Sequence, residues 1–229
     1  MSEPLPRSLN HFCNFRFTQD YWRLAPQDRL DVHASFLAGL KDAAETVHCY
    51  QLFPTETASD FLIWTAIPAE TSDVPSTFFP KFARGTVPAR RYLEPTTVLW
   101  GLTRPSQYSK ARSRQAMDPF APNRAPYLIV YPFTKTSEWY LLDQEVRQQL
   151  MNDHIRIGKQ YSSITQLLLY SFGLQDEEFV VVYETSDLSE FSMLVHDLRM
   201  TEARRFTLND APVHTALHRP AEAPLALWE

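Results

Sequence analysis

The sequence predicts an α+β protein built as two ferredoxin-like halves in one chain, of the dimeric α+β barrel type, with antiparallel sheets and the helices outside. Three repeated features lead to this fold class. A strand-like aromatic run followed by a tryptophan occurs twice, and Trp22 and Trp139 are 117 residues apart. An acidic residue at the start of a later strand also recurs, and Asp60 and Glu178 are 118 residues apart. A helical stretch and a strand lie between these markers in each half, so one plan of elements is repeated once.

The second half reads as β-α-β-β-α-β, the order of the ferredoxin-like split unit. Apolar residues recur at helical spacing along its first helix, from Val146 and Leu150 to Ile157 and Tyr161. Asp143 and Asp187 are the expected N-caps of its two helices. The expected strands are about 127–133, 164–171, 178–185 and 205–215, and the expected helices are 143–160 and 187–200.

The first half follows the same plan less regularly. Leu30, Leu37 and Leu40 mark one face of its first helix, and a strand at 96–103 closes the half. Its second helix falls in a segment that contains Pro75, Pro80 and Pro88. We expect the two sheets to pack face to face around one core. The predicted units are an N-terminal half at 9–103, a linker at 104–126 and a C-terminal half at 127–217.

The linker is rich in proline and in positive charge. It contains four prolines and has Asp118 as its single acidic residue. Its cations are Arg104, Lys110, Arg112, Arg114 and Arg124. It is either a solvated loop or a basic flap over an anionic ligand.

Composition excludes several classes of function. The formal net charge of −5 gives no support for a nucleic-acid partner. The chain has only five glycines and contains neither a GxGxxG nor a Walker sequence. No apolar run is long enough for membrane insertion, and the first residues do not resemble a signal peptide. Cys13 and Cys49 read as reduced thiols, which favours a cytoplasmic protein.

His154 stands out because it interrupts the apolar stripe of a helix. Steps of four from Leu150 and three to Ile157 place it on the face that points at the sheet. It is either a core histidine with satisfied hydrogen bonds or a metal ligand through one ring nitrogen. The other histidines form no HxxH or HExxH pattern with it. A lone protein ligand favours haem over zinc, because a porphyrin supplies four further nitrogens.

Several segments together resemble the chlorite dismutase-like haem proteins. They are YLIVYPFTKTSEWYLL, MNDHIRIGKQY, YSFGLQDEEFVVVYET and LRMTEARRFT, with TRPSQYSKAR before them. The resemblance is strong from about Val98 to Thr215 and weak in the N-terminal half. It implies two ferredoxin-like halves and a homo-oligomer, most commonly a pentamer. The place equivalent to His154 in the first half is near Phe36, so we expect haem in the second half only.

The resemblance also assigns roles to individual residues. His154 matches the axial iron ligand, and Glu202 in TEARR matches the acid that hydrogen-bonds that histidine. Trp139 matches a tryptophan of the haem pocket. Taken alone, Glu202 would be a surface charge and Trp139 a core residue. Apart from the resemblance, the basic linker would suit an anionic porphyrin, and its Arg112 and Arg114 are candidate partners for the propionates.

Two positions indicate the branch of the family. The chlorite-degrading enzymes have an arginine where Gln166 stands, and a neutral glutamine cannot replace its charge. One alignment gap leaves Leu167 as the alternative occupant. Tyr131 matches the redox tyrosine of the coproheme decarboxylases, and Lys135 matches the lysine that assists it. From spacing alone, these two residues would be a core tyrosine and a solvated lysine.

The resulting expectation is a haem-dependent oxidoreductase. With hydrogen peroxide as oxidant, it would convert two propionates of coproheme III, which is both substrate and cofactor, into vinyls and release haem b. Chlorite dismutation is not expected. The alternatives are a general haem peroxidase, a haem carrier or sensor without turnover, and a member of the fold that binds no haem.

Overall fold

The computed structural model describes residues 7–108, 113–219 and 227. In the first half the elements are β1 (Ser8–Phe17), α1 (Gln19–Trp22), α2 (Pro26–Ala43), β2 (Thr46–Gln51), β3 (Phe61–Pro68), α3 (Val74–Thr86), the 3-10 turn η1 (Val87–Ala89) and β4 (Leu93–Thr103). In the second half they are β5 (Tyr127–Lys135), α4 (Ser137–Leu141), α5 (Gln144–Gly158), β6 (Thr165–Tyr170), β7 (Phe179–Thr185), α6 (Leu188–Arg199), η2 (Glu202–Phe206), β8 (Thr207–Asn209) and β9 (His214–Arg219).

The two halves have the same strand order, which confirms the predicted fold class. The orders are β4-β1-β3-β2 and β9-β5-β7-β6, with every pairing antiparallel. β2 also pairs with β9, and β4 pairs with β6. The half-sheets therefore share hydrogen bonds at both edges, which closes an eight-stranded ring. The edge pairings β2–β9 and β4–β6, which the sequence analysis did not name, are what close the predicted barrel.

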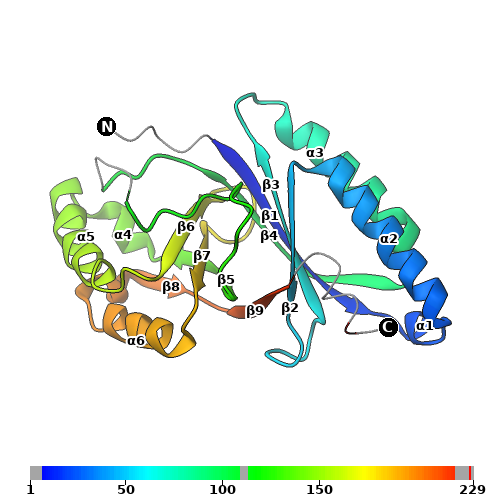
Figure 1. Ribbon diagram of the computed structural model, residues 1–229. Coiled ribbons are helices and arrows are strands. Elements are labelled where there is room, and N and C mark those ends of the chain that lie inside the picture. Colours follow the sequence, from blue (N-terminus) through cyan, green and yellow to red (C-terminus); the bar gives the residue numbers. More distant parts are fainter. Residues whose placement is uncertain (1–6, 109–112, 220–226, 228–229) are drawn as a thin grey trace.

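Helices cover opposite sides of this barrel, with α2 and α3 on one half and α4, α5 and α6 on the other (Figure 1). One apolar core fills the barrel and includes Phe12, Trp64, Leu128, Leu167 and Val182 from both halves. A second core lies under α2 and α3, and a third lies between the C-terminal half-sheet and its helices. Among the described residues, no helix has both the length and the apolar character needed to span a membrane.

The internal repeat extends to individual hydrogen bonds between equivalent residues. The carboxylate of Asp60 accepts a hydrogen bond from the backbone N–H of Phe17 at 2.7 Å. The carboxylate of Glu178 accepts one from the backbone N–H of Lys135 at 2.8 Å. Both acids thus anchor the end of the first strand of their half, and both members of the pair shift by 118 residues. This offset relates equivalent positions of the two halves.

In the first half, the proline-containing segment does form a helix. Pro75 lies in the first turn of α3, where its missing N–H has no helical partner to lose. α2 and α3 cross at Gly39 and Gly85, because a Cβ on Gly39 would lie 2.5 Å from the Cα of Gly85. Leu30, which was expected on the buried face of α2, is 39% exposed.

Two details of the second half differ from expectation. The strand expected at 205–215 is divided into β8 and β9, and residues 202–206 before it form a 3-10 turn. β8 pairs with the end of β5, whereas β9 pairs with the start of β5 and with β2. The side chain of Asp187 caps α6 by accepting from the N–H groups of Ser189 and Glu190. Asp143 is at the N-cap of α5, but its side chain makes no capping hydrogen bond.

Candidate functional site

The outer face of the C-terminal half-sheet carries two of the predicted residues. Gln166 of β6 pairs with Tyr183 of β7, and Tyr131 of β5 pairs with Val181. Paired residues share a face, whereas alternate residues point into the barrel. Leu167 is 5% exposed and belongs to the barrel core. Of the two candidates for the distal position, only Gln166 therefore shares the outer face with Tyr131.

His154 lies on α5, which contacts α6 and η2 on this side of the barrel. No residue of α5 is fully buried, and Val146, the first residue of the expected stripe, is 40% exposed. The stripe is therefore less covered than its spacing predicted. Burial, followed by the charge of Lys135, lowers the pKa of His154 to about 4. Its imidazole is neutral at pH 7 and keeps a lone pair for a metal.

The donor chemistry around His154 fits an iron porphyrin better than a bare metal ion. In the described part of the chain, no group of three or more His, Cys, Asp or Glu side chains could hold a metal ion. A single imidazole is sufficient only where other nitrogens complete the coordination sphere, as in haem. His154 is the residue that would provide the protein ligand.

Lys135 and Trp139 are brought together at the end of β5. Nζ of Lys135 lies 4.3 Å from the centroid of the Trp139 ring and 3.4 Å from the carbonyl oxygen of Ala203, to which it donates. Trp139 is 3% exposed. Burial, with the positive charge of Arg204 as a second cause, lowers the pKa of Lys135 to about 8. The lysine is half-buried and forms no ion pair among the described residues.

In the first half, the place equivalent to Lys135 and Trp139 is filled by hydrophobic core residues. At the offset of 118 residues, Lys135 and Trp139 correspond to Phe17 and Tyr21. Those two rings stack with centroids 4.1 Å apart. An ammonium over an indole thus replaces an aromatic pair, and a cation–π contact replaces simple stacking.

The position equivalent to His154 is Phe36. Phe36 is fully buried and packs on Phe15 and Phe61, with ring centroids 5.3 and 6.2 Å apart. The N-terminal half therefore fills this place with hydrocarbon. In the C-terminal half the same place holds a neutral, half-buried imidazole.

Tyr131 is half-buried in the core cluster between the sheet and α6. Its hydroxyl is hydrogen-bonded to that of Tyr183, and the two rings stack 6.3 Å apart. Burial, and then Tyr183, raise the pKa of Tyr131 well above 10. The phenol is therefore protonated at every physiological pH.

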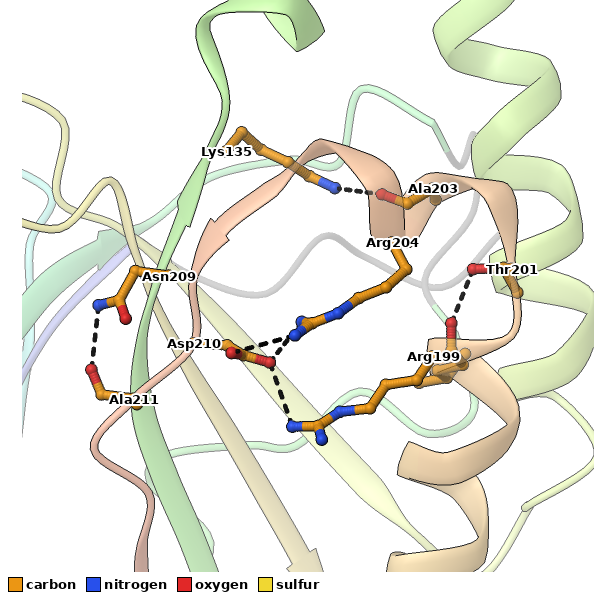
Figure 2. A network of polar contacts seen from close by, with 9 residues as sticks. Lys135, Arg199, Thr201, Ala203, Arg204, Asn209, Asp210 and Ala211 are labelled. Carbon is orange, nitrogen blue, oxygen red and sulfur yellow. Dashed lines mark hydrogen bonds and ion pairs between the residues drawn. The ribbon is translucent and has the colours of Figure 1, made fainter.

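A network of charged side chains adjoins Tyr131 and Lys135, and the sequence analysis missed it. Figure 2 shows Arg204 and Arg199 converging on Asp210, with nitrogen–oxygen distances of 2.5 and 3.4 Å. The charge of Asp210 raises the pKa of Tyr131, and that of Arg199 lowers it. Arg204 follows Glu202 by two residues in the TEARR motif, so this motif was the sequence signal for a site that includes Arg204.

Glu202 itself is exposed on η2. Its carboxylate forms an ion pair with Nε of Arg205 at 3.0 Å. The charge that acts on His154 is that of Lys135. A hydrogen bond between Glu202 and His154 stays a prediction.

The linker is attached to both the barrel and α5. Gln115 donates from Nε2 to the carbonyl oxygens of Gly158, Tyr161 and Ile164, and the neighbouring Ala116 bridges to Gln166. Of the predicted propionate partners, Arg114 is exposed and Arg112 lies outside the described residues.

Two other linker cations occupy defined places. Arg124 is buried in the barrel, 3.5 Å from the carboxylate of Glu184 and over the Trp64 ring. Arg104 lies over the ring of Tyr170. The described part of the linker is therefore packed against the protein and is not simply a solvated loop.

The closed ring of two ferredoxin-like halves, in which His154 of the second half stands where the first half has the core residue Phe36, defines an α+β barrel protein whose two halves are not equivalent. The sequence profile of the family described as chlorite dismutase matches residues 29–219, and the chain belongs to this family.

Relatives and solved structures agree with this assignment. Coproheme decarboxylase of Mycolicibacterium smegmatis is 29% identical over 189 residues, which cover 82% of this chain and 80% of that protein. Coproheme decarboxylase of Staphylococcus carnosus is 29% identical over 200 residues, which cover 79% of each. Both relatives are enzymes, and both align with most of this chain, which supports the conclusion that this protein is an enzyme.

The fold similarity extends over nearly the whole chain. Chlorite dismutase from Candidatus Nitrospira defluvii in complex with imidazole superposes with a TM-score of 0.82 at 23% identity and covers 96% of this chain and 94% of that one. A doubly mutated form of the same enzyme gives 0.83 at 24%, with 96% and 95% covered. At this level of identity, the similarity concerns the fold alone.

Proposed function

We propose that the protein is a haem-dependent enzyme that decarboxylates coproheme III oxidatively. Two propionates become vinyl groups, haem b is the product, and hydrogen peroxide is the oxidant. The observation that carries this proposal is the grouping of a neutral imidazole, a protonated phenol and an indole-bound ammonium in the C-terminal half. Both curated relatives described above are named for the same activity.

The ligand side of the proposal rests on α5 and its counterpart. His154 would bind the iron and Trp139 would line the pocket. The C-terminal half, 127–217, would hold the porphyrin, because the place of His154 is taken by Phe36 in the first half. Bound haem iron, with peroxide, would supply the oxidising power.

The reaction side rests on Tyr131. In each conversion the propionate arm would lose a hydrogen atom and one further electron, and its carboxylate would leave as carbon dioxide. These two electrons, the proton of that hydrogen and one proton from solvent would reduce one peroxide to two waters. A tyrosine can mediate such a step by giving up its phenolic hydrogen and then taking one from the substrate. Tyr131 is held in place by Tyr183, and its high pKa keeps the phenolic hydrogen present beforehand.

The other predicted residues would bind carboxylates and peroxide or orient the iron ligand. Lys135, whose pKa of about 8 leaves it mostly protonated at pH 7, would hold the carboxylate that is to be lost. Gln166 would face peroxide with a neutral amide. Glu202 would orient His154, and Arg112 and Arg114 would bind propionates. A general haem peroxidase would retain His154 but would not need Tyr131.

The proposal extends to the assembly and location of the protein. We expect a homo-oligomer, with a pentamer favoured, which light scattering of the purified protein would measure. The two cysteines are free and buried, which is compatible with the cytoplasm.

Incubation of the purified protein with coproheme III and hydrogen peroxide tests the function directly. Mass spectrometry should show the loss of two carbon dioxide molecules and the appearance of haem b. A reaction preloaded with haem b is the control, and its porphyrin mass should not change. Steady peroxide consumption with coproheme left intact would favour the general peroxidase instead.

A further inference from the structure

We propose that the guanidinium of Arg147 binds a peripheral carboxylate of the porphyrin and selects for carboxylated porphyrins. This inference rests on the proposed function and adds a residue for which the sequence offered no role. Arg147 precedes His154 by seven residues on α5. Seven residues make almost two helical turns, so both side chains lie on one face, about 10 Å apart along the axis.

The side chain of Arg147 is incompletely satisfied within the protein. Its Nε is buried and has no hydrogen-bond partner in the structure. Over residues 7–108 and 113–219, no carboxylate forms an ion pair with it. Asp143 and Glu145, the acids nearest in sequence, are both exposed. A buried guanidinium nitrogen without an acceptor is unfavourable, so the site favours an acceptor supplied by a ligand.

The equivalent arginine of the first half shows the contrast. Arg29 lies 118 residues earlier, and its Nη2 donates to the carbonyl oxygen of Trp22 at 3.1 Å. Its guanidinium also lies over the rings of Tyr21 and Trp22, at 5.3 and 5.6 Å. The Nε atoms of both arginines are buried, so the contrast lies in the terminal nitrogens. Nη2 of Arg29 has a backbone acceptor, and among the described residues Arg147 forms no corresponding hydrogen bond.

The neighbourhood of Arg147 is the end of the site where the linker approaches α5. Gln148 donates to the carbonyl oxygen of Tyr108, whose ring is 6.4 Å from that of Trp139. The charge of Arg147 acts on Tyr140 of α4. A porphyrin held by His154 extends a propionate arm over a distance comparable with the separation of the two residues. A planar guanidinium can bind such a carboxylate through two parallel hydrogen bonds.

Binding of metal-free coproporphyrin tests this role without iron or turnover. Fluorescence titration would give dissociation constants for the wild type, Arg147→Gln and Arg147→Lys. We expect about a tenfold to hundredfold loss of affinity in Arg147→Gln, from the loss of a charge-assisted hydrogen bond. Arg147→Lys should be intermediate, because it keeps the charge and loses the paired geometry.

Arg156→Gln is the matched control. It removes an arginine from the same helix, where the side chain is exposed and pairs with Asp153 at 3.4 Å. Its affinity should stay near that of the wild type. A parallel titration uses the tetramethyl ester of coproporphyrin, which lacks carboxylates, and for this ligand Arg147→Gln should match the wild type.

The outcomes separate the two proposals. Equal affinity of Arg147→Gln and wild type for coproporphyrin would overturn the role of Arg147 and leave the function intact. An equal loss for the free acid and its ester would also overturn it, since packing would then explain the effect. If the wild type binds no porphyrin, both proposals fail. If Arg147→Gln does not fold, the comparison of Arg147→Lys with Arg156→Gln decides, and equal affinities would overturn the role.

Discussion

The ammonium of Lys135 lies over the ring of Trp139, with Nζ 4.3 Å from the ring centroid. In the other half of the chain, the stacked rings of Phe17 and Tyr21 occupy the equivalent place. Burial is the main cause that lowers the pKa of Lys135 to about 8. The ammonium therefore loses its proton within the pH range of ordinary buffers.

This relationship predicts how ligand binding depends on pH. Lys135 is charged below about pH 8 and neutral above it. The affinity for metal-free coproporphyrin should therefore weaken as pH rises from 7 to 9. Lys135→Met should bind more weakly at pH 7 and show a flatter profile in the same titration. Lys159→Met, an exposed lysine at the end of α5, is the control and should keep the wild-type profile. An unchanged profile in Lys135→Met would exclude the lysine as a carboxylate partner.

His154→Phe should remove iron binding and leave the fold intact, because phenylalanine already occupies the equivalent place as Phe36. Haem titration monitored at the Soret band measures the effect, and we expect a sharp loss of affinity. His196→Phe, on the exposed face of α6, should bind haem normally. A Soret band of unchanged position and strength in His154→Phe would contradict the ligand assignment.

The same histidine predicts acid sensitivity. Its folded pKa of about 4 lies below the ordinary value of 6.5, so the unfolded chain takes up the proton first. The stability due to the neutral imidazole is present above pH 6.5 and is lost as pH falls towards 4, by up to about 1.4 kcal/mol per pH unit. Urea unfolding of the ligand-free protein at several pH values should show a shallower decline for His154→Phe. Parallel declines would show that His154 does not contribute.

Tyr131→Phe should bind coproheme with a near-normal spectrum, consume peroxide and form almost no haem b. The ring and nearly all the volume are kept, and the lost hydrogen bond to Tyr183 costs about 1 kcal/mol of stability. Tyr127→Phe, four residues earlier on the same strand, is the control and should produce haem b normally. A full yield from Tyr131→Phe would rule out its role in the reaction.

Chlorite should yield little or no oxygen with this protein. The outer-face position carries Gln166, which has no charge to retain an anionic chlorine oxide near the iron. An oxygen electrode makes the measurement on the haem-loaded protein, with a chlorite dismutase as the positive control. A fast and sustained oxygen burst would place the chain in the chlorite-degrading branch.

Arg124→Leu should destabilise the fold strongly, by about 3–5 kcal/mol, because it leaves the buried carboxylate of Glu184 without its cation. Both side chains are nearly inaccessible, at 3% and 5% exposure. Arg16→Leu, which breaks the exposed and solvent-screened pair with Glu94, should change stability far less. Chemical denaturation compares the two variants. Similar effects would show that Arg124 contributes no more than a surface charge.

The sequence by itself determined the repeat and the local elements. The markers Asp60 and Glu178 predicted the register of the two halves, because they recur at one offset that can be read along the chain. Helical spacing placed His154 on the inward face of its helix. Such features depend on periodicity and on neighbours in the chain, which a single sequence displays.

Only the tertiary structure decided which distant groups meet. It closed the barrel edges through β2 and β9, and it placed Gln166 outside and Leu167 inside. It also buried Arg124 of the linker beside Glu184 and assembled Arg199, Arg204 and Asp210 next to Tyr131. These contacts join segments whose separation along the chain bears no relation to their distance in space. They arise when whole elements pack, so the alternation of polar and apolar residues within one element carries no record of them.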